Sequence, residues 1–106
     1  MKLSATILAA GASKRMGDLN KLLLQIDNKP IIYSVCKTAL GSKLDQIILV
    51  TGYENSEIEK TVPKGIDDIV NNKNWRHGMM SSIYAGLSNL DDDVDGNMII
   101  LGDMPL

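Results

Sequence analysis

The feature that most constrains this chain is a loop of small and positively charged residues directly after an apolar run. The run Leu3 to Leu8 predicts a β-strand. The loop, Leu-Ala-Ala-Gly-Ala-Ser-Lys-Arg-Met-Gly, extends from Leu8 to Gly17, and Lys21 follows it. Glycines and small side chains allow main-chain N–H groups to gather around an anion, and the cations add positive charge. The sequence therefore predicts a polyphosphate-binding loop at the carboxyl end of the first strand.

Two widespread phosphate-binding motifs do not occur in this loop. No Gly-x-x-x-x-Gly-Lys-Ser/Thr spacing is present, since Met16 stands five residues after Gly11 and Asp18, not Lys, follows Gly17. The dinucleotide-binding pattern Gly-x-Gly-x-x-Gly is missing as well. The chain is thus neither a P-loop protein nor a nicotinamide-binding one. The remaining alternative is an ordinary turn with solvated lysine and arginine side chains.

Strand-like and helix-like patterns alternate along the rest of the chain. Buried strands are predicted for Gln46–Thr51 and Met98–Leu101, and a weaker strand for Asp68–Asn71. Three helices are predicted between the strands. The first, Pro30–Gly41, has an apolar stripe of Ile31, Ile32, Val35, Cys36, Ala39 and Leu40. The second, Asn55–Val62, would turn Ile58 and Val62 toward the sheet, and the third, Met79–Leu90, has Met80, Ile83, Leu87 and Leu90 on one side. This alternation predicts an α/β fold in one nucleotide-binding domain over residues 1–106, with a doubly wound, Rossmann-like, mostly parallel sheet.

The fourth predicted strand has an apolar sequence that other parts of a protein would have to cover. If the order of the strands is 3-2-1-4, Met98–Leu101 lies at the edge of the sheet although its composition is that of an interior strand. We expect this edge to pair with a second copy of the chain, as a homo-oligomer, or to be left for a segment that follows Leu106.

Composition argues against several partners and locations. A net charge of −2 gives no broad basic field, so we expect no nucleic acid. No run approaches the ~20 apolar residues that span a bilayer, and no signal peptide is recognisable, so we expect no membrane. Cys36 is the only cysteine, which predicts a buried thiol, no intrachain disulfide and a cytoplasmic location.

A second motif, Leu-Gly-Asp-Met-Pro, covers Leu101 to Pro105. Asp103 directly follows the fourth strand, at the edge where the first strand also ends if the two are neighbours. Mg²⁺ prefers such oxygen ligands and commonly combines one or two carboxylates with substrate phosphates. Asp103 is therefore a candidate metal ligand, and the alternative is an aspartate that caps a turn before Pro105.

A third motif covers Asn72 to Ser82. Ser81 and Ser82 begin the third predicted helix, where free N–H groups and the positive end of the helix dipole favour an anion or a polar base edge. The alternative is that Ser81 only caps the helix and Trp75 packs against the sheet, which we prefer for Trp75. The lone His77 is given no role, and we expect the acidic run Asp91–Asp93 to be solvated.

Together these motifs resemble those of the molybdenum cofactor nucleotidyltransferase family, the MobA-like NTP transferases. The family's loop is Leu-Ala-Ala-Gly-x-Ser-x-Arg-Met-Gly followed by Lys, and its later motif is Asn-Pro-x-Trp-x-x-Gly-Met-x-Ser-Ser. Lys73 departs from the proline of that second pattern. The resemblance covers the whole chain but only about the first half of a family member, so we expect an incomplete nucleotidyltransferase fold.

The resemblance also implies roles for individual residues. Arg15 and Lys21 would be catalytic. Arg15 would bind the β- and γ-phosphates, and Lys21 would stabilise negative charge near the α-phosphate. Asp103 would hold Mg²⁺, weakly, because the family's second carboxylate lies in its C-terminal half. The implied nucleotide-binding residues are Leu8, Ala9, Ala10, Gly11, Ala12 and Ser13 in the loop, and Asn72, Gly78 and Ser82 beside the base and ribose.

By resemblance, the reaction is transfer of CMP from CTP to the phosphate of molybdenum-bearing molybdopterin, with release of pyrophosphate. Ala10, the Gly78-Met79 pair and the Ser81-Ser82 pair favour this cytidylyltransferase branch. The insertion Asp18-Leu19-Asn20 instead matches the guanylyltransferase branch, so GTP stays open. A non-catalytic nucleotide-binding fragment is a further alternative, because the acceptor site would lie in the other half of the family fold.

Overall fold

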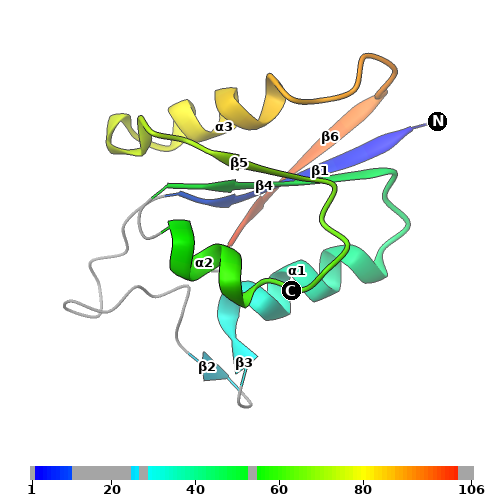
Figure 1. Cartoon of the computed structure of the whole chain (residues 1–106). Helices are drawn as coiled ribbons and strands as arrows, with labels where there is room; N and C mark the ends of the chain where they lie inside the picture. Colours follow the sequence, from blue (N-terminus) through cyan, green and yellow to red (C-terminus); the bar gives the residue numbers. More distant parts are fainter. Residues whose placement is uncertain (1, 11–24, 27–28, 53–54, 103–106) are drawn as a thin grey trace.

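The structure is a computed structural model that describes residues 2–10, 25–26, 29–52 and 55–102 (Figure 1). Its main sheet contains four strands, β1 (Leu3–Ala9), β4 (Gln46–Thr51), β5 (Asp68–Asn71) and β6 (Gly96–Leu101), and a short hairpin pairs β2 (Gln25–Ile26) with β3 (Lys29–Pro30). The helices are α1 (Ile31–Gly41), α2 (Asn55–Thr61) and α3 (Met79–Leu87), with a 3-10 turn η2 (Trp75–His77) before α3.

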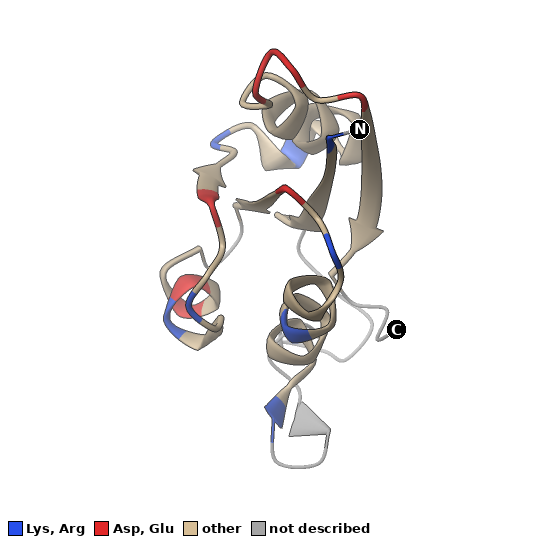
Figure 2. Cartoon of the chain, turned by 90° about the vertical axis from the view of Figure 1, so that its right-hand side faces the viewer, with Lys and Arg blue, Asp and Glu red and all other residues tan. Residues whose placement is uncertain are grey.

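The main sheet is parallel throughout, and its strands lie in the order β5-β4-β1-β6. α3 covers one face of the sheet, while α1 and α2 lie on the other (Figure 1). Seen along the strands, the molecule is therefore a three-layer sandwich (Figure 2). The α/β fold and the strand order predicted from the sequence are confirmed.

Alternate residues of the strands supply two separate cores. On the side of α1 and α2, the buried cluster combines strand residues with helix residues: Ala5, Ile7, Ala9, Ile47, Leu49 and Ile100 with Ile32, Val35, Cys36, Ala39 and Ile58. On the side of α3, the cluster contains Leu8, Ala10, Ile48 and Val50, with Trp75, Ile83, Ala85 and Leu90 packed against it. Because β1 and β4 are covered on both faces, their continuous apolar sequences are explained.

The helix α1 follows its predicted stripe closely. All but one of the six stripe residues are buried, and Leu40 packs at the border of the same core. Pro30, predicted in the first turn, instead precedes the helix with an extended backbone (φ −58°, ψ 146°) and pairs with Gln25 in the hairpin. The sequence patterns did not predict this hairpin, since each of its strands has only two residues.

The prediction for α3 was right for Ile83 and Leu90, which pack against the core, but wrong for Met80 and Leu87 and for the end of the helix. Met80 is 72% exposed and Leu87 is 43% exposed, whereas Ser82 and Gly86 are the buried residues of this helix. At Gly86 the helix lies so close to the sheet that an added Cβ would overlap the Thr6 methyl group. It ends at Leu87 rather than Leu90, where the Ser88 hydroxyl donates back to the Tyr84 carbonyl oxygen (2.8 Å).

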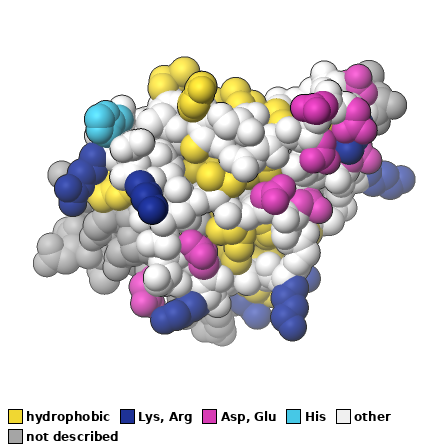
Figure 3. Space-filling model, turned by 45° about the horizontal axis from the view of Figure 1, so that its top comes forward, with side chains coloured by type: hydrophobic (Ala, Val, Ile, Leu, Met, Phe, Trp, Pro, Cys, Tyr) yellow, Lys and Arg dark blue, Asp and Glu magenta, His cyan; other side chains and the backbone are white. Residues whose placement is uncertain are grey.

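The strand β6 lies at the edge of the sheet, as the strand order predicts. Met98 is 56% exposed, and Ile99 is exposed as well. Hydrophobic side chains are also exposed over α3, on the side shown in Figure 3. Pairing of the β6 edge with a second copy stays a prediction. Among the helices that the structure describes, none combines the length and apolar character needed to cross a membrane.

The amino edge of the sheet is closed by aspartates. Asp45 accepts a hydrogen bond from the Leu3 N–H (2.7 Å), Asp67 from the Ile47 N–H (2.6 Å) and Asp95 from the Lys2 N–H (2.6 Å). Each of these aspartates precedes one strand and binds the start of a neighbouring one.

The acidic loop after α3 lies close to the N-terminus (Figure 2). Within it, Asp91 and Asp93 accept hydrogen bonds from the Lys2 ammonium at 3.1 and 2.9 Å. These contacts raise the pKa of Lys2 and lower that of Asp93. Among the described residues no group of three or more potential ligands could hold a metal ion, so this loop is not a metal cluster there.

Cys36 is buried and free, and burial raises the pKa of its thiol to about 12. The thiolate is the reactive form, so the native protein should react with a thiol reagent such as DTNB at pH 8 only when it unfolds. We expect the labelling rate to follow the unfolding rate as urea is added. Rapid stoichiometric labelling without denaturant would contradict the buried position of Cys36.

Replacing Gly86 by Ala should destabilise the fold, because the new methyl group overlaps Thr6 and lies 3.2 Å from the Val50 Cγ2 atom. Overpacking of this kind costs about 1–3 kcal/mol of unfolding free energy, measured by urea denaturation. Gly41→Ala is the matched control, since a Cβ at Gly41 has no neighbour within 4 Å. Equal stability of the two variants would show that α3 does not lie this close to the sheet.

Candidate functional site

The first strand and the last strand of the sheet end side by side. Leu8, Ala9 and Ala10 are buried at the end of β1, and the Gly102 N–H donates to the Leu8 carbonyl oxygen (2.9 Å). Gly102 directly follows β6, so the start of the predicted phosphate loop and the approach to Asp103 are adjacent. The remaining predicted residues of these two motifs, Gly11, Ala12, Ser13, Arg15, Lys21 and Asp103, lie outside the residues that the structure describes.

The third motif reaches the same edge through Asn72, which follows β5. Its N–H donates to the Thr51 carbonyl oxygen (2.6 Å) at the end of β4. Its side-chain amide donates to the hydroxyl oxygens of Ser81 and Ser82, each at 3.0 Å, and its Oδ1 accepts from the Asn74 N–H at 3.0 Å. The structure therefore brings Asn72 and Ser82 together, as two members of one buried polar network.

This network fixes the beginning of α3. The Ser81 hydroxyl lies 2.7 Å from the Gly78 carbonyl oxygen and 3.0 Å from that of Asn74. Gly78 precedes the helix with φ +100°, and no side chain accepts a hydrogen bond from the first turn at that position. Ser81 therefore stabilises the approach to the helix without acting as its N-cap residue.

The exposures of the predicted residues differ. Asn72 and Ser82 are 6% and 4% exposed, while Gly78 is exposed. The two polar side chains therefore have little surface left for a ligand, and most of their hydrogen-bonding capacity is used within the protein. Around Gly78, main-chain groups at the start of α3 are the accessible ones, and helix starts of this kind favour anions.

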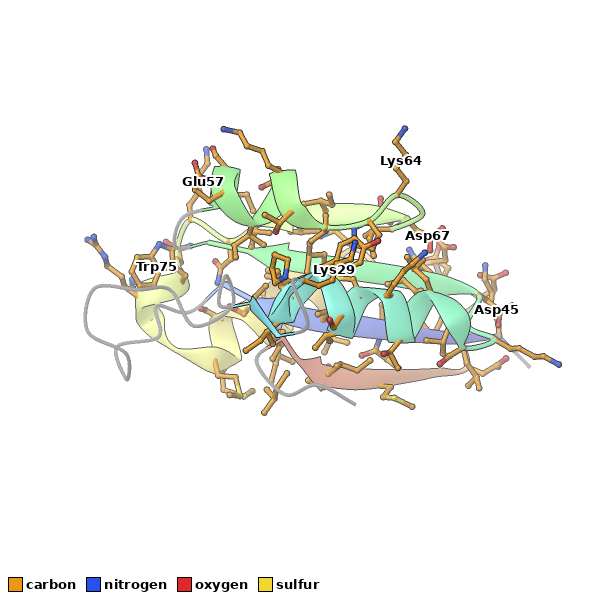
Figure 4. The ribbon with its side chains drawn as sticks, turned by 90° about the horizontal axis from the view of Figure 1, so that it is seen from below. Lys29, Asp45, Glu57, Lys64, Asp67 and Trp75 are labelled. Atoms are coloured by element: carbon orange, nitrogen blue, oxygen red, sulfur yellow. The ribbon has the colours of Figure 1, made fainter. Side chains whose placement is uncertain are left out.

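Trp75 lies at the carboxyl end of the sheet, opposite the end where Asp45 is found (Figure 4). It is partly buried against the α3-side core, which confirms that it packs on the sheet. Arg76 lies over its ring, with 5.1 Å between the guanidinium carbon and the ring centroid. Aromatic and cationic groups thus gather at the edge where the predicted nucleotide loop begins.

Sequence reasoning treated Gly52 only as a turn residue, whereas the structure places it in the centre of this edge. A Cβ built on Gly52 would lie 2.7 Å from the Trp75 Cβ atom and 2.8 Å from the Ala10 carbonyl oxygen. A glycine directly after a buried strand, at the edge that carries the motifs, was the available signal. Its meaning depended on the position of Trp75, which the sequence did not reveal.

The arrangement is a sheet edge at which three separate motifs of the sequence converge. Residues 5–106 match the family described as MobA-like NTP transferase domain, and the chain belongs to this family. It is 36% identical to a Thermococcus gammatolerans protein and 35% identical to a Thermococcus kodakarensis protein, both named probable molybdenum cofactor guanylyltransferase. The resemblance to this family expected from the sequence is confirmed.

The solved structures support the same fold. A nucleotidyl transferase from Methanothermobacter thermautotroptrophicus superposes with a TM-score of 0.86 at 26% identity, covering 98% of this chain and 51% of that one. The two Thermococcus alignments cover 94% of this chain and 48% and 45% of those proteins. The chain therefore spans about half the length of the relatives it matches.

Replacing Asn72 by Ala should lower the unfolding free energy by about 2 kcal/mol, because it removes the hydrogen bonds of a buried side chain and leaves the buried Ser82 hydroxyl without the amide that donates to it. The Ser81 hydroxyl and the Asn74 N–H lose one hydrogen bond each. Urea denaturation measures the loss. Asn89→Ala is the control, since Asn89 is exposed and, among the described residues, its side-chain amide donates to the Ala85 carbonyl oxygen alone (2.9 Å). A loss no greater than that of the control would show that the network contributes little.

Proposed function

We propose that this chain forms the nucleotide-binding half of a nucleotidyltransferase that transfers GMP from GTP to the molybdenum cofactor. The observation that carries the proposal is the hydrogen bond from the Gly102 N–H to the Leu8 carbonyl oxygen. It joins the strand end that leads into the cationic loop to the strand end that leads to Asp103. A triphosphate and its metal ion need both kinds of group at one place.

In the proposed reaction an acceptor phosphate oxygen attacks the α-phosphorus of the nucleotide. The bond from that phosphorus to the bridging oxygen breaks, and pyrophosphate leaves with the electron pair. No protein nucleophile is needed, because positioning and charge neutralisation supply most of the catalysis of phosphoryl and nucleotidyl transfer. The family's own chemistry therefore requires a cradle of N–H groups and cations rather than a catalytic triad.

Each part of the cradle has an assigned role. The N–H groups from Ala10 to Ser13 and the Arg15 guanidinium hold the β- and γ-phosphates, since Arg can bind two oxygens at once. Lys21 stabilises negative charge near the α-phosphate. The first turn of α3, anchored by Asn72, and the exposed backbone at Gly78 border the base and ribose.

Asp103 is the residue that would hold Mg²⁺. A carboxylate two residues after a parallel strand, at the edge where the phosphate loop begins, is a ligand of the type that Mg²⁺ prefers. The metal supplies neutralisation of phosphate charge. The position of Gly102 beside Leu8 is the structural feature that agrees with this assignment.

Two observations favour guanine over cytosine. Both Thermococcus relatives carry the name guanylyltransferase, and the spacer Asp18-Leu19-Asn20 before Lys21 agrees with that branch. The Leu-Ala-Ala-Gly sequence favours CTP, so the two nucleotides must be compared directly. We place the protein in the cytoplasm, where molybdopterin with its terminal phosphate is the proposed acceptor.

GTP with Mg²⁺ should raise the melting temperature of the protein more than CTP with Mg²⁺ at the same concentration. A ligand at a hundred times its dissociation constant adds about 2.7 kcal/mol to the unfolding free energy, and differential scanning fluorimetry detects this as a shift of several degrees. A larger shift with CTP would reverse the assignment of the nucleotide, and no shift with either would contradict a nucleotide site.

Lys21→Ala should lose most of the GTP-induced shift while the melting temperature without ligand stays the same, because the change removes a cation from the phosphate cradle only. Lys64→Ala is the matched control, since Lys64 is exposed and lies far from Trp75 in Figure 4. In a complete enzyme that contains this half, Lys21→Ala should lower turnover by orders of magnitude. Normal turnover would remove Lys21 from the mechanism.

A further inference from the structure

We propose that Gly52 is a positioning residue of the nucleotide site, an inference that rests on the proposed function. Gly52 follows β4 and is buried between two groups that belong to different motifs. A Cβ at this position would lie 2.7 Å from the Trp75 Cβ atom, 2.9 Å from the Trp75 Cδ1 atom and 2.8 Å from the Ala10 carbonyl oxygen. The absence of a side chain therefore allows the third motif and the start of the phosphate loop to meet.

Gly52 has little freedom to move away from a new methyl group. Its own carbonyl oxygen accepts a hydrogen bond from the Asn55 N–H (3.1 Å) at the start of α2. The preceding carbonyl oxygen, that of Thr51, accepts from the Asn72 N–H (2.6 Å). The backbone on both sides of Gly52 is thus tied to neighbouring elements, and a side chain added there must displace its neighbours instead.

The neighbour with the greater consequence is Ala10. Its carbonyl group is main chain and cannot rotate away as the end of a flexible side chain could. Ala10 is buried, and in the proposed function the residues from Ala10 to Ser13 present the N–H groups that hold the phosphates. A shift of the Ala10 peptide would therefore misplace the first donors of the cradle. Misplacement by about 1 Å at a preorganised site can cost up to about a hundredfold.

The test compares nucleotide affinity in three glycine variants of the 106-residue chain. Gly52→Ala should weaken the binding of GTP with Mg²⁺ at least about tenfold by isothermal titration calorimetry. Gly86→Ala is the control for lost stability, since its added methyl group overlaps Thr6 in the middle of the sheet, away from the motifs. Gly41→Ala is the control for the substitution itself, because a Cβ there has no neighbour within 4 Å.

All titrations are made at a temperature where circular dichroism shows each variant to be folded. A merely structural role for Gly52 would give Gly52→Ala the same affinity as Gly86→Ala, and that result would overturn the inference. Gly52→Ala should also shift the fluorescence of Trp75, the single tryptophan, in the absence of nucleotide, whereas Gly86→Ala should not. An unchanged Trp75 spectrum in Gly52→Ala would count equally against it.

If Gly52→Ala does not fold, Trp75→Ala tests the contact between Gly52 and Trp75 by changing the other residue. It keeps Gly52 and removes the indole that packs there, so GTP affinity should fall several-fold in the folded protein. Unchanged affinity overturns the inference. The wild-type titration distinguishes failure of the proposed function from failure of this inference. If the wild-type protein binds neither GTP nor CTP, both the proposed function and the inference are overturned. If the wild-type protein binds and Gly52→Ala binds equally well, only the inference is overturned.

Discussion

The rest of the structure depends on the parallel pairing of β1 with β4 on one side and with β6 on the other. β1 is the interior strand that touches both, and its register places Ala9 opposite Thr51 and Leu8 opposite Leu101. Parallel strands all finish at one edge, so the chain segments that leave these strands must begin close together. Motifs far apart in the sequence become neighbours for this reason alone, before any side chain takes part.

The amino and carboxyl edges of the sheet are held together by different kinds of contact. At the amino edge, Asp45, Asp67 and Asp95 bind main-chain N–H groups of neighbouring strands, and Lys2 neutralises part of the acidic loop. Hydrogen bonds to charged acceptors are stronger than neutral ones. At the carboxyl edge, the described contacts include close main-chain approaches at Gly52 and Gly102, the Asn72 side-chain network, and the Glu59 carboxylate, which accepts from the Thr51 hydroxyl (3.1 Å). The three aspartates that bind strand N–H groups thus lie at the edge opposite the converging motifs.

The sequence predicted what depends on hydrophobic periodicity and missed what depends on close packing. The α1 stripe and the strand order followed from apolar residues that a two-sided parallel sheet must bury. The face of α3 did not, because Gly86 and Ser82 pack there in place of Met80 and Leu87. Of the candidate site, the convergence of the three motifs was predictable from topology. The role of Gly52 was not, since a glycine has no side chain to signal what approaches it.

The small residues of α3 also explain how its beginning is placed. Gly86 lets the helix axis approach Thr6 and Val50, and four residues earlier Ser82 accepts a hydrogen bond from Asn72 at the end of β5. These two contacts lie on the same face of the helix, one turn apart, so they fix both its distance from the sheet and its position along it. The first turn of α3 follows η2, whose Trp75 lies against Gly52, and Gly52 in turn lies against the Ala10 carbonyl group. Small residues of α3 therefore face the sheet beside Ile83 and Ala85, while Met80, Tyr84 and Leu87 of the same helix are exposed.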